Sequence, residues 1–134
     1  MNMSERFAYC APPWFQFACF EHRGETWLVS DCFAVRAPES EAETVREKAR
    51  SRVASPFGDV IDAMPARSFV PFVDEELGLV RVGKAQVARE YFEFVSAELR
   101  GVRWHSSDAE SNVYASLDGA PVAIIGPMLQ GVAA

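Results

Sequence analysis

Residues 84–128 read KAQVAREYFEFVSAELRGVRWHSSDAESNVYASLDGAPVAIIGPM and predict a helix, a strand and a hairpin. The first part repeats apolar residues at three- and four-residue steps, which is the spacing of one helix face. Gly101 predicts the helix end, because glycine readily adopts the left-handed conformation found at helix C-termini. Residues 102–105 then alternate in polarity as a half-buried strand does. Asp118 and Gly119 separate two short apolar runs, which is a strong hairpin pattern.

The first half of the chain predicts further strands and a second helix. Ser40 and Glu43 have capping-box spacing, which predicts a helix start. A thin apolar stripe continues this helix to residue 53. Pro56 interrupts the pattern, and a short helix is expected between there and Pro65. Strands are expected at residues 15–20, 26–29, 33–35, 68–73 and 77–82.

These elements predict an α+β fold in a single domain over residues 1–134. We expect a mainly antiparallel sheet with two principal helices, near 40–53 and 85–100, packed on one face. A chain of 134 residues is long enough to bury a core without disulfides. The expected core contains Phe17, Leu28, Val29, Val60, Ile61, Phe92, Val95, Leu99, Val102, Trp104, Val122 and Ile124.

Composition limits the classes of function and partner. The net charge of −6 opposes nonspecific binding to nucleic acid by the molecule as a whole. No apolar run is long enough to cross a bilayer, and the N-terminus lacks a signal pattern, so no membrane association and a cytoplasmic location are expected. Three cysteines favour reduced thiols over a disulfide framework. Ten Phe, three Tyr and three Trp are many for a small core, which predicts a homo-oligomer that associates through an edge strand or through an aromatic surface.

The cysteines give weak evidence for a metal site. Cys19 and His22, with Cys10 and Cys32 nearby, contain ligand types that bind zinc. Their spacing does not form the paired knuckles of structural zinc sites, and Cys19 lies in an apolar strand pattern. No metal or cofactor is therefore expected, and buried thiols are the better interpretation.

Catalytic residues are permitted by composition but carry no motif. His22 or His105 could serve as a base for a serine or cysteine nucleophile, since geometry alone defines such a site. Asp31 could act as an acid at a strand end, although a turn-forming aspartate is the commoner role. No catalytic residue is assigned, and a small hydrolase-type enzyme remains an alternative.

Basic side chains on the two predicted helices suggest an interaction with duplex DNA. If the helices lie side by side, their outer surfaces could track a phosphate backbone without recognising bases. The alternative is an ordinary solvated helix surface, which nearby glutamates favour. The candidate DNA contacts are Arg46, Lys48, Arg50, Arg52, Lys84 and Arg89.

The helix-and-hairpin stretch resembles the last half-repeat of a bacterial β sliding clamp domain. In that family a helix with an aromatic residue near its start leads into three strands and an ending of the type apolar-apolar-x-Pro-Met. Residues 91–95, YFEFV, match the helix, and residues 122–128, VAIIGPM, match the ending. Residues 27–36, WLVSDCFAVR, resemble the clamp segment strand-Thr-Asp-Gly-strand, with Ser30 for threonine and Cys32 for glycine. A helix that the resemblance leads us to expect near the N-terminus, between the first two strands, is not evident in this sequence.

The resemblance implies a non-catalytic role in replication. A clamp subunit has three such domains and closes a ring that slides on duplex DNA, whereas this chain has room for one, so oligomerisation would be needed. We therefore expect a protein-interaction or scaffold domain. The resemblance suggests that it is a clamp-like replication accessory of phage type. A small acidic phage-encoded inhibitor that covers a host protein is the alternative. In both cases a protein partner is expected, and fold alone does not decide between them.

Overall fold

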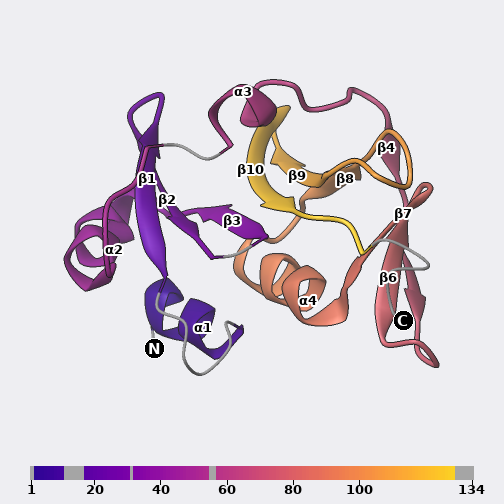
Figure 1. The fold of residues 1–134 in the computed structure, drawn as a ribbon, viewed down its shortest axis with the longest axis horizontal. Helices are drawn as coiled ribbons and strands as arrows, with labels where there is room; N and C mark the ends of the chain where they lie inside the picture. The colour runs from indigo at the N-terminus through magenta and orange to yellow at the C-terminus, as the bar shows by residue number, and fades with distance from the viewer. Residues whose placement is uncertain (1, 11–16, 31, 55–56, 129–134) are drawn as a thin grey trace.

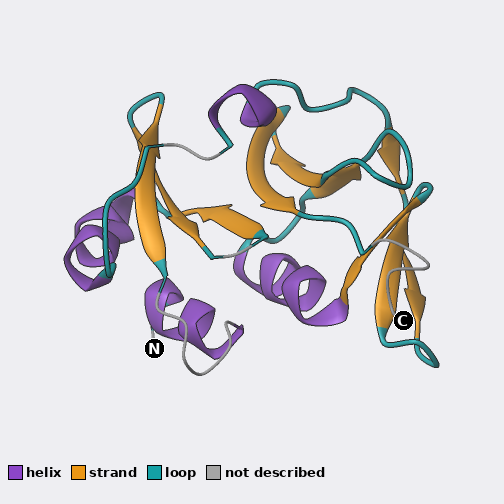
Figure 2. Cartoon of the chain, viewed as in Figure 1, coloured by secondary structure: helices purple, strands orange, loops and turns teal. Residues whose placement is uncertain are grey.

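The main sheet of this α+β protein contains seven antiparallel strands (Figures 1 and 2). The computed structural model describes residues 2–10, 17–30, 32–54 and 57–128. The strand order is β1-β2-β3-β10-β9-β8-β4. The bounds are β1 Ala18–His22, β2 Glu25–Val29, β3 Phe33–Arg36, β4 Ser68–Phe69, β8 Arg103–His105, β9 Val113–Leu117 and β10 Ala120–Ile125. The predicted fold class is confirmed.

A second, three-stranded sheet was not expected. It contains β5 (Phe72–Asp74), β6 (Leu79–Val82) and β7 (Ala85–Ala88), in the order β5-β6-β7. The predicted strand at 68–73 is in fact divided between β4 in the main sheet and β5 in the second. Pro71 lies at the division, where its missing N–H removes a ladder donor.

Both predicted helices lie on the same face of the main sheet, together with a third. Val45 of α2 and Phe94 of α4 belong to one buried cluster, which also contains Phe7 of α1. Ile61 of α3 belongs to a separate cluster on the other face. The helices are α1 Met3–Cys10, α2 Ala42–Lys48, α3 Gly58–Ile61 and α4 Arg89–Glu98, and a 3-10 turn, η1, spans Glu39–Glu41.

The helix predicted over 40–53 is shorter than expected, because its second half pairs with β1. The N–H of Arg50 donates to the carbonyl of Phe17 at 2.9 Å, and the N–H of Val53 donates to that of Cys19 at 2.9 Å. Residues 50–53 therefore run parallel to β1 and cover its outer edge. This pairing gives hydrogen-bond partners to the backbone groups on the edge of β1. The thin apolar stripe of a continued helix would bury little surface in its place.

The predicted helix starts are also corrected. The prediction of a capping box at Ser40 and Glu43 is wrong, because α2 begins at Ala42 and its N-cap Glu41 makes no side-chain capping bond. Residues 85–88 are a strand instead of the first turn of a helix. Ala85 and Val87 are buried while the residues after each are half-buried, so this segment has the period of two that a strand requires.

Helix α1, which the sequence analysis missed, is capped by Asn2. The Oδ1 atom of Asn2 accepts hydrogen bonds from the Glu5 N–H at 3.0 Å and from the Ser4 hydroxyl at 2.8 Å. Asn2 and Glu5 have the same three-residue spacing that was noted at Ser40, so a sequence signal for this helix exists.

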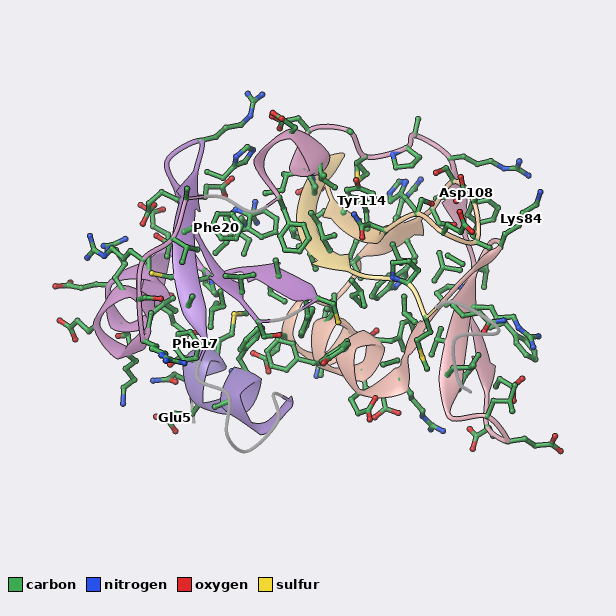
Figure 3. The ribbon with its side chains drawn as sticks, viewed as in Figure 1. Glu5, Phe17, Phe20, Lys84, Asp108 and Tyr114 are labelled. Carbon is green, nitrogen blue, oxygen red and sulfur yellow. The ribbon has the colours of Figure 1, made fainter. Side chains whose placement is uncertain are left out.

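Most of the predicted core is buried. Of the twelve residues named, nine are buried, and Val60, Phe92 and Val102 are half-buried against the clusters. The helix-side cluster also includes Val80, Val82, Ala85 and Val87 from the second sheet, so the two sheets share one core. Figure 3 shows the side chains that fill the space between them.

Aromatic rings connect α1, β3 and α4 at the centre of this core. The Phe33 ring lies 5.2 Å from Phe7, 4.6 Å from Tyr91 and 5.7 Å from Phe94, centroid to centroid. Among the aromatic residues whose burial is described, only Phe72 is mostly exposed. The aromatic residues whose burial is described therefore serve the core more than the surface.

Two hairpin turns have the geometry that their sequences favour. Asp118 and Gly119 both have positive φ, at 51° and 80°, as a type I′ turn requires, and they join β9 to β10. Arg23 and Gly24 repeat this geometry between β1 and β2, with φ of 51° and 78°. The predicted hairpin at Asp118 is confirmed.

The main sheet contains the same helix-and-three-strands unit twice. The first unit is α1-β1-β2-β3 and the second is α4-β8-β9-β10. Their last strands pair antiparallel, with Ala34 opposite Ile124. Their helices lie side by side on the same face (Figure 1), where Phe7 contacts Phe94. The two units are therefore related by an approximate two-fold arrangement about the β3–β10 pair.

Candidate functional site

The six candidate DNA contacts are spread over three parts of the molecule, with Arg89 at the start of α4. Arg46 and Lys48 are on α2, and Arg50 and Arg52 follow on the extended segment beside β1. Lys84 lies in the turn between β6 and β7. Along the longest axis of the molecule, α2 and the β6–β7 hairpin occupy opposite ends (Figures 1 and 3). The expectation that all six are helical is wrong for Arg50, Arg52 and Lys84. The structure does not bring the six into one patch.

Two of these cations are paired with acids. Arg46 donates to the Thr26 hydroxyl at 2.9 Å and lies 3.6 Å from the Glu21 carboxylate. Arg89 pairs with Glu93 one helical turn away and with Glu75 at 3.6 Å. Such pairs lower the positive field that would attract a phosphate.

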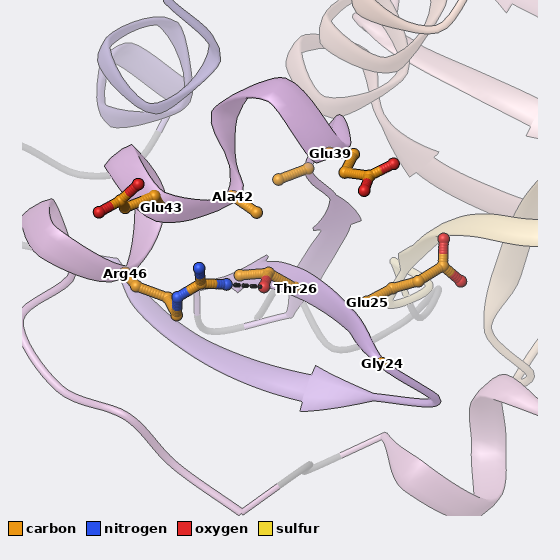
Figure 4. A pocket seen from close by; sticks show the side chains of 8 residues that line it. Gly24, Glu25, Thr26, Glu39, Ala42, Glu43 and Arg46 are labelled. Carbon is orange, nitrogen blue, oxygen red and sulfur yellow. Dashed lines mark hydrogen bonds between the residues drawn. The ribbon is translucent and has the colours of Figure 1, made fainter.

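A polar hollow lies beside Arg46, between α2 and the β1–β2 hairpin (Figure 4). Its volume is about 540 Å³, and Thr26 forms part of its wall. Three glutamates and one arginine line it, so its charge disfavours an anionic ligand. The lining residues are Gly24, Glu25, Thr26, Ala37, Glu39, Ala42, Glu43 and Arg46.

His105 lies against a serine that the sequence analysis did not single out. Its Nε2 atom is 2.7 Å from the Ser116 hydroxyl, and both residues line a hollow of about 470 Å³. The register explains the contact, because β8 and β9 place Arg103 opposite Ser116 and His105 two residues further along. His105 and Ser116 are only 5% and 2% exposed, and the His105 Nδ1 atom is buried without a partner in the described structure.

This pair has the donor and acceptor needed for proton transfer but lacks other catalytic features. A general base normally has a third group that orients its second nitrogen. Among the described residues, the Nδ1 atom of His105 has no such partner, and the Ser116 hydroxyl has almost no access to a substrate. The geometry is that of a buried polar pair that stabilises the β8–β9 ladder.

His22 faces an acid on the protein surface. Its Nε2 atom lies 3.2 Å from Asp62 Oδ1, and Arg23 donates two hydrogen bonds of 3.1 Å to the same carboxylate. The hydrogen bond from Arg23, followed by that from His22, lowers the pKa of Asp62 below its ordinary value. The cluster joins the β1–β2 turn to the end of α3, which is a structural role.

The cysteines do not form a metal centre in the described structure. Cys19 is buried, and burial raises the pKa of its thiol above the ordinary value. In the part of the chain that is described, no group of three or more His, Cys, Asp or Glu side chains is placed to hold a metal ion. The side chain of Cys10 and the candidate acid Asp31 lie outside the described residues.

Exposed apolar side chains mark the connection between the two sheets. Val70 is 92% exposed, and Phe72 is 58% exposed on the edge strand β5. A groove of about 290 Å³ lies between this connection and the start of β8. The sequence pattern did not predict this groove, because Pro71 indicated only an edge strand or a bulged strand at residues 68–73.

Comparison with models of protein families, with curated proteins and with solved structures gave no match. The relation to sliding clamps therefore stays a prediction from the sequence. Within the described residues, no helix is long and apolar enough to span a membrane.

Proposed function

We propose that this protein is a non-catalytic interaction domain with the architecture of a sliding-clamp domain, and that it binds a protein. The observation that carries the proposal is the repeated unit of one helix and three strands, joined through β3 and β10. The clamp resemblance matched a half-repeat at the C-terminus and one strand-turn-strand segment at residues 27–36. A second copy near the N-terminus supports a domain made of two half-repeats.

The charge of the paired helices favours a protein partner over DNA. Helices α1 and α4 together carry four acids and two arginines. Both arginines are neutralised by acids: Arg6 donates to Glu98 at 2.7 Å across the helix pair, and Arg89 pairs with Glu93. A helix face with excess negative charge repels a phosphate backbone.

The acidic inhibitor remains an alternative within the same class. It needs a partner protein as well, and differs in that binding blocks the partner's own activity. The homo-oligomer is still a prediction, but its argument from surplus aromatic residues is weakened, because the described aromatic residues are largely in the core. It now depends on association through an edge strand and on the clamp resemblance.

A hydrolase is supported by one contact, the 2.7 Å distance between His105 and Ser116. The burial of Ser116 argues against it, as does the lack of a third group among the residues that the structure describes. We therefore rank the enzyme last.

Affinity capture tests the proposed function. The immobilised protein should retain a protein partner from a lysate of its source that has been treated with nuclease, because the contact is with protein and not with nucleic acid. Beads carrying a heat-unfolded sample serve as the control for nonspecific adsorption. Retention that nuclease abolishes, or that the unfolded sample reproduces, would contradict the proposal.

We expect weak binding to duplex DNA. If the cations near α2 do contact phosphates, the binding constant should fall as salt rises. Replacing Lys48, Arg50 and Arg52 with alanine should then reduce the slope of its logarithm against the logarithm of salt concentration by roughly three, at about 0.9 per contact. Arg46 is left intact because it is bonded to Thr26. Fluorescence anisotropy of a labelled duplex over a salt series measures the slope.

The matched control for this test is Lys84→Ala, a cation at the opposite end. An absence of binding at low salt, or an unchanged slope in the triple variant, removes the DNA-contact hypothesis and leaves protein binding in place.

A further inference from the structure

The groove beside β4 has an apolar floor and one highly exposed apolar side chain at its edge. Phe69, Pro71 and Val102 are half-buried along it, and the Trp104 ring is buried beneath with 4% exposure. Val70 stands out at 92% exposure. An apolar valine this exposed, next to a preformed hollow, is a feature of surfaces that bind a partner.

One arginine lines this groove, a second precedes its first lining residue Ser68, and both are without an acidic partner among the described residues. Arg103 lines the groove and is exposed. The Arg67 guanidinium lies over the Phe69 ring, 5.0 Å from its centroid, which fixes a positive charge on an apolar surface. Neither forms any of the ion pairs of the described structure, and none of the described residues that line the groove is acidic.

The balance of charge here is opposite to that of the molecule. The chain as a whole has a net charge of −6. A groove with cations and no acid on such a protein is complementary to a carboxylate next to an apolar side chain. Arginine also matches the geometry of a carboxylate, because its two N–H groups can bind both oxygens.

We infer that this groove binds a short acidic segment of a partner protein through one apolar anchor residue. The anchor occupies the space between Val70 and Val102, and a flanking Asp or Glu contacts Arg103. This inference rests on the proposed function, because it assigns the surface that contacts the protein partner.

A protein segment fits the groove better than single-stranded nucleic acid. Nucleic-acid grooves follow a phosphate backbone with several cations and stack bases on open aromatic faces. Here the Phe69 ring face carries Arg67, Trp104 is buried, and the most exposed side chain is aliphatic. The net negative charge would also repel the rest of the strand.

Selection from a display library of random short peptides tests the inference. The wild-type protein is immobilised, and enriched peptides are synthesised with a fluorescent label. We expect them to contain an apolar residue next to Asp or Glu. Val70→Asp and Arg103→Glu should each weaken binding by at least about tenfold, as loss of an interface anchor does.

The segment beside β1 supplies matched controls. Val53 is 40% exposed and Arg52 is exposed, so Val53→Asp and Arg52→Glu make the same changes far from the groove. They should leave peptide affinity unchanged. Because the two groove positions are exposed, their variants should keep the wild-type circular dichroism spectrum and melting temperature.

Three outcomes overturn the inference. They are failure to enrich any peptide, equal binding of the enriched peptides to the groove variants, and binding of labelled oligothymidylate that depends on Arg103 while peptides do not bind. If the partner found by affinity capture still binds the Val70→Asp and Arg103→Glu variants, the proposed function stands and only this surface is wrong.

Discussion

Replacing Phe33 with alanine should lower the free energy of unfolding by about 3–5 kcal/mol, the usual cost of removing a buried ring. Phe33 is fully buried, and its ring contacts Phe7, Tyr91 and Phe94. The change would leave a cavity where α1, β3 and α4 meet. Because small domains are stable by only about 5–15 kcal/mol, the variant should lose a large share of its stability. Urea denaturation followed by circular dichroism measures the loss.

Phe72→Ala is the matched control for this prediction. Phe72 is 58% exposed and has Arg81 5.7 Å from its ring centroid, so truncation should cost about 1 kcal/mol or less. Phe33→Leu, which leaves a smaller cavity, should give an intermediate loss if the alanine variant does not fold. Equal losses at Phe33 and Phe72 would mean that the aromatic cluster is not the centre of the core.

Replacing Gly83 with alanine should have the second-largest effect. Gly83 has a φ of +61°, and an added Cβ would lie 2.8 Å from the Ser106 hydroxyl and 3.0 Å from the Phe69 ring. The left-handed conformation costs a non-glycine residue about 1–2 kcal/mol. Overpacking against Phe69 should add about 1–3 kcal/mol.

Gly78→Ala separates the two contributions. Gly78 has a similar φ of +64°, but its Cβ would have no neighbour within 4 Å. This control should therefore lose only the conformational part. The excess at Gly83 measures how tightly the β6–β7 turn packs on β4 and β8. Equal losses at the two positions would show that the sheets are not in close contact there.

The Gly83 variant should also affect local opening of the second sheet. The Ser106 hydroxyl donates to the Val82 carbonyl at 2.6 Å, close to the position of the added Cβ. Displacing it should speed hydrogen exchange in β6 and β7 of the second sheet more than in β2 and β3 of the main sheet.

Local sequence determined the elements whose conformation depends on neighbouring residues. Asp118 and Gly119 specify a type I′ turn because both can take positive φ at low cost. Gly101, with φ of +84°, follows α4 for the same reason. The alternation in residues 102–105 and the apolar spacing of α4 were sufficient to predict β8, most of the helix and much of the core.

The capping pattern was less decisive, because its effect depends on what surrounds it. The same three-residue spacing occurs at Asn2 and at Ser40, yet only Asn2 caps a helix. Around Ser40 the chain forms a 3-10 turn, and Glu41 instead accepts a hydrogen bond of 2.7 Å from the Met3 N–H. A capping bond contributes about 1 kcal/mol, which a tertiary contact can outweigh.

Only the tertiary structure decided the features that depend on residues distant in sequence. Residues 50–53 are extended because β1 offers free backbone partners, and residues 85–88 form a strand because β6 does the same. The contact of His105 with Ser116 depends on strand register, and the groove at Val70 depends on how two sheets meet. Helix propensities differ by less than about 1 kcal/mol per residue, so long-range pairing and burial determined these positions.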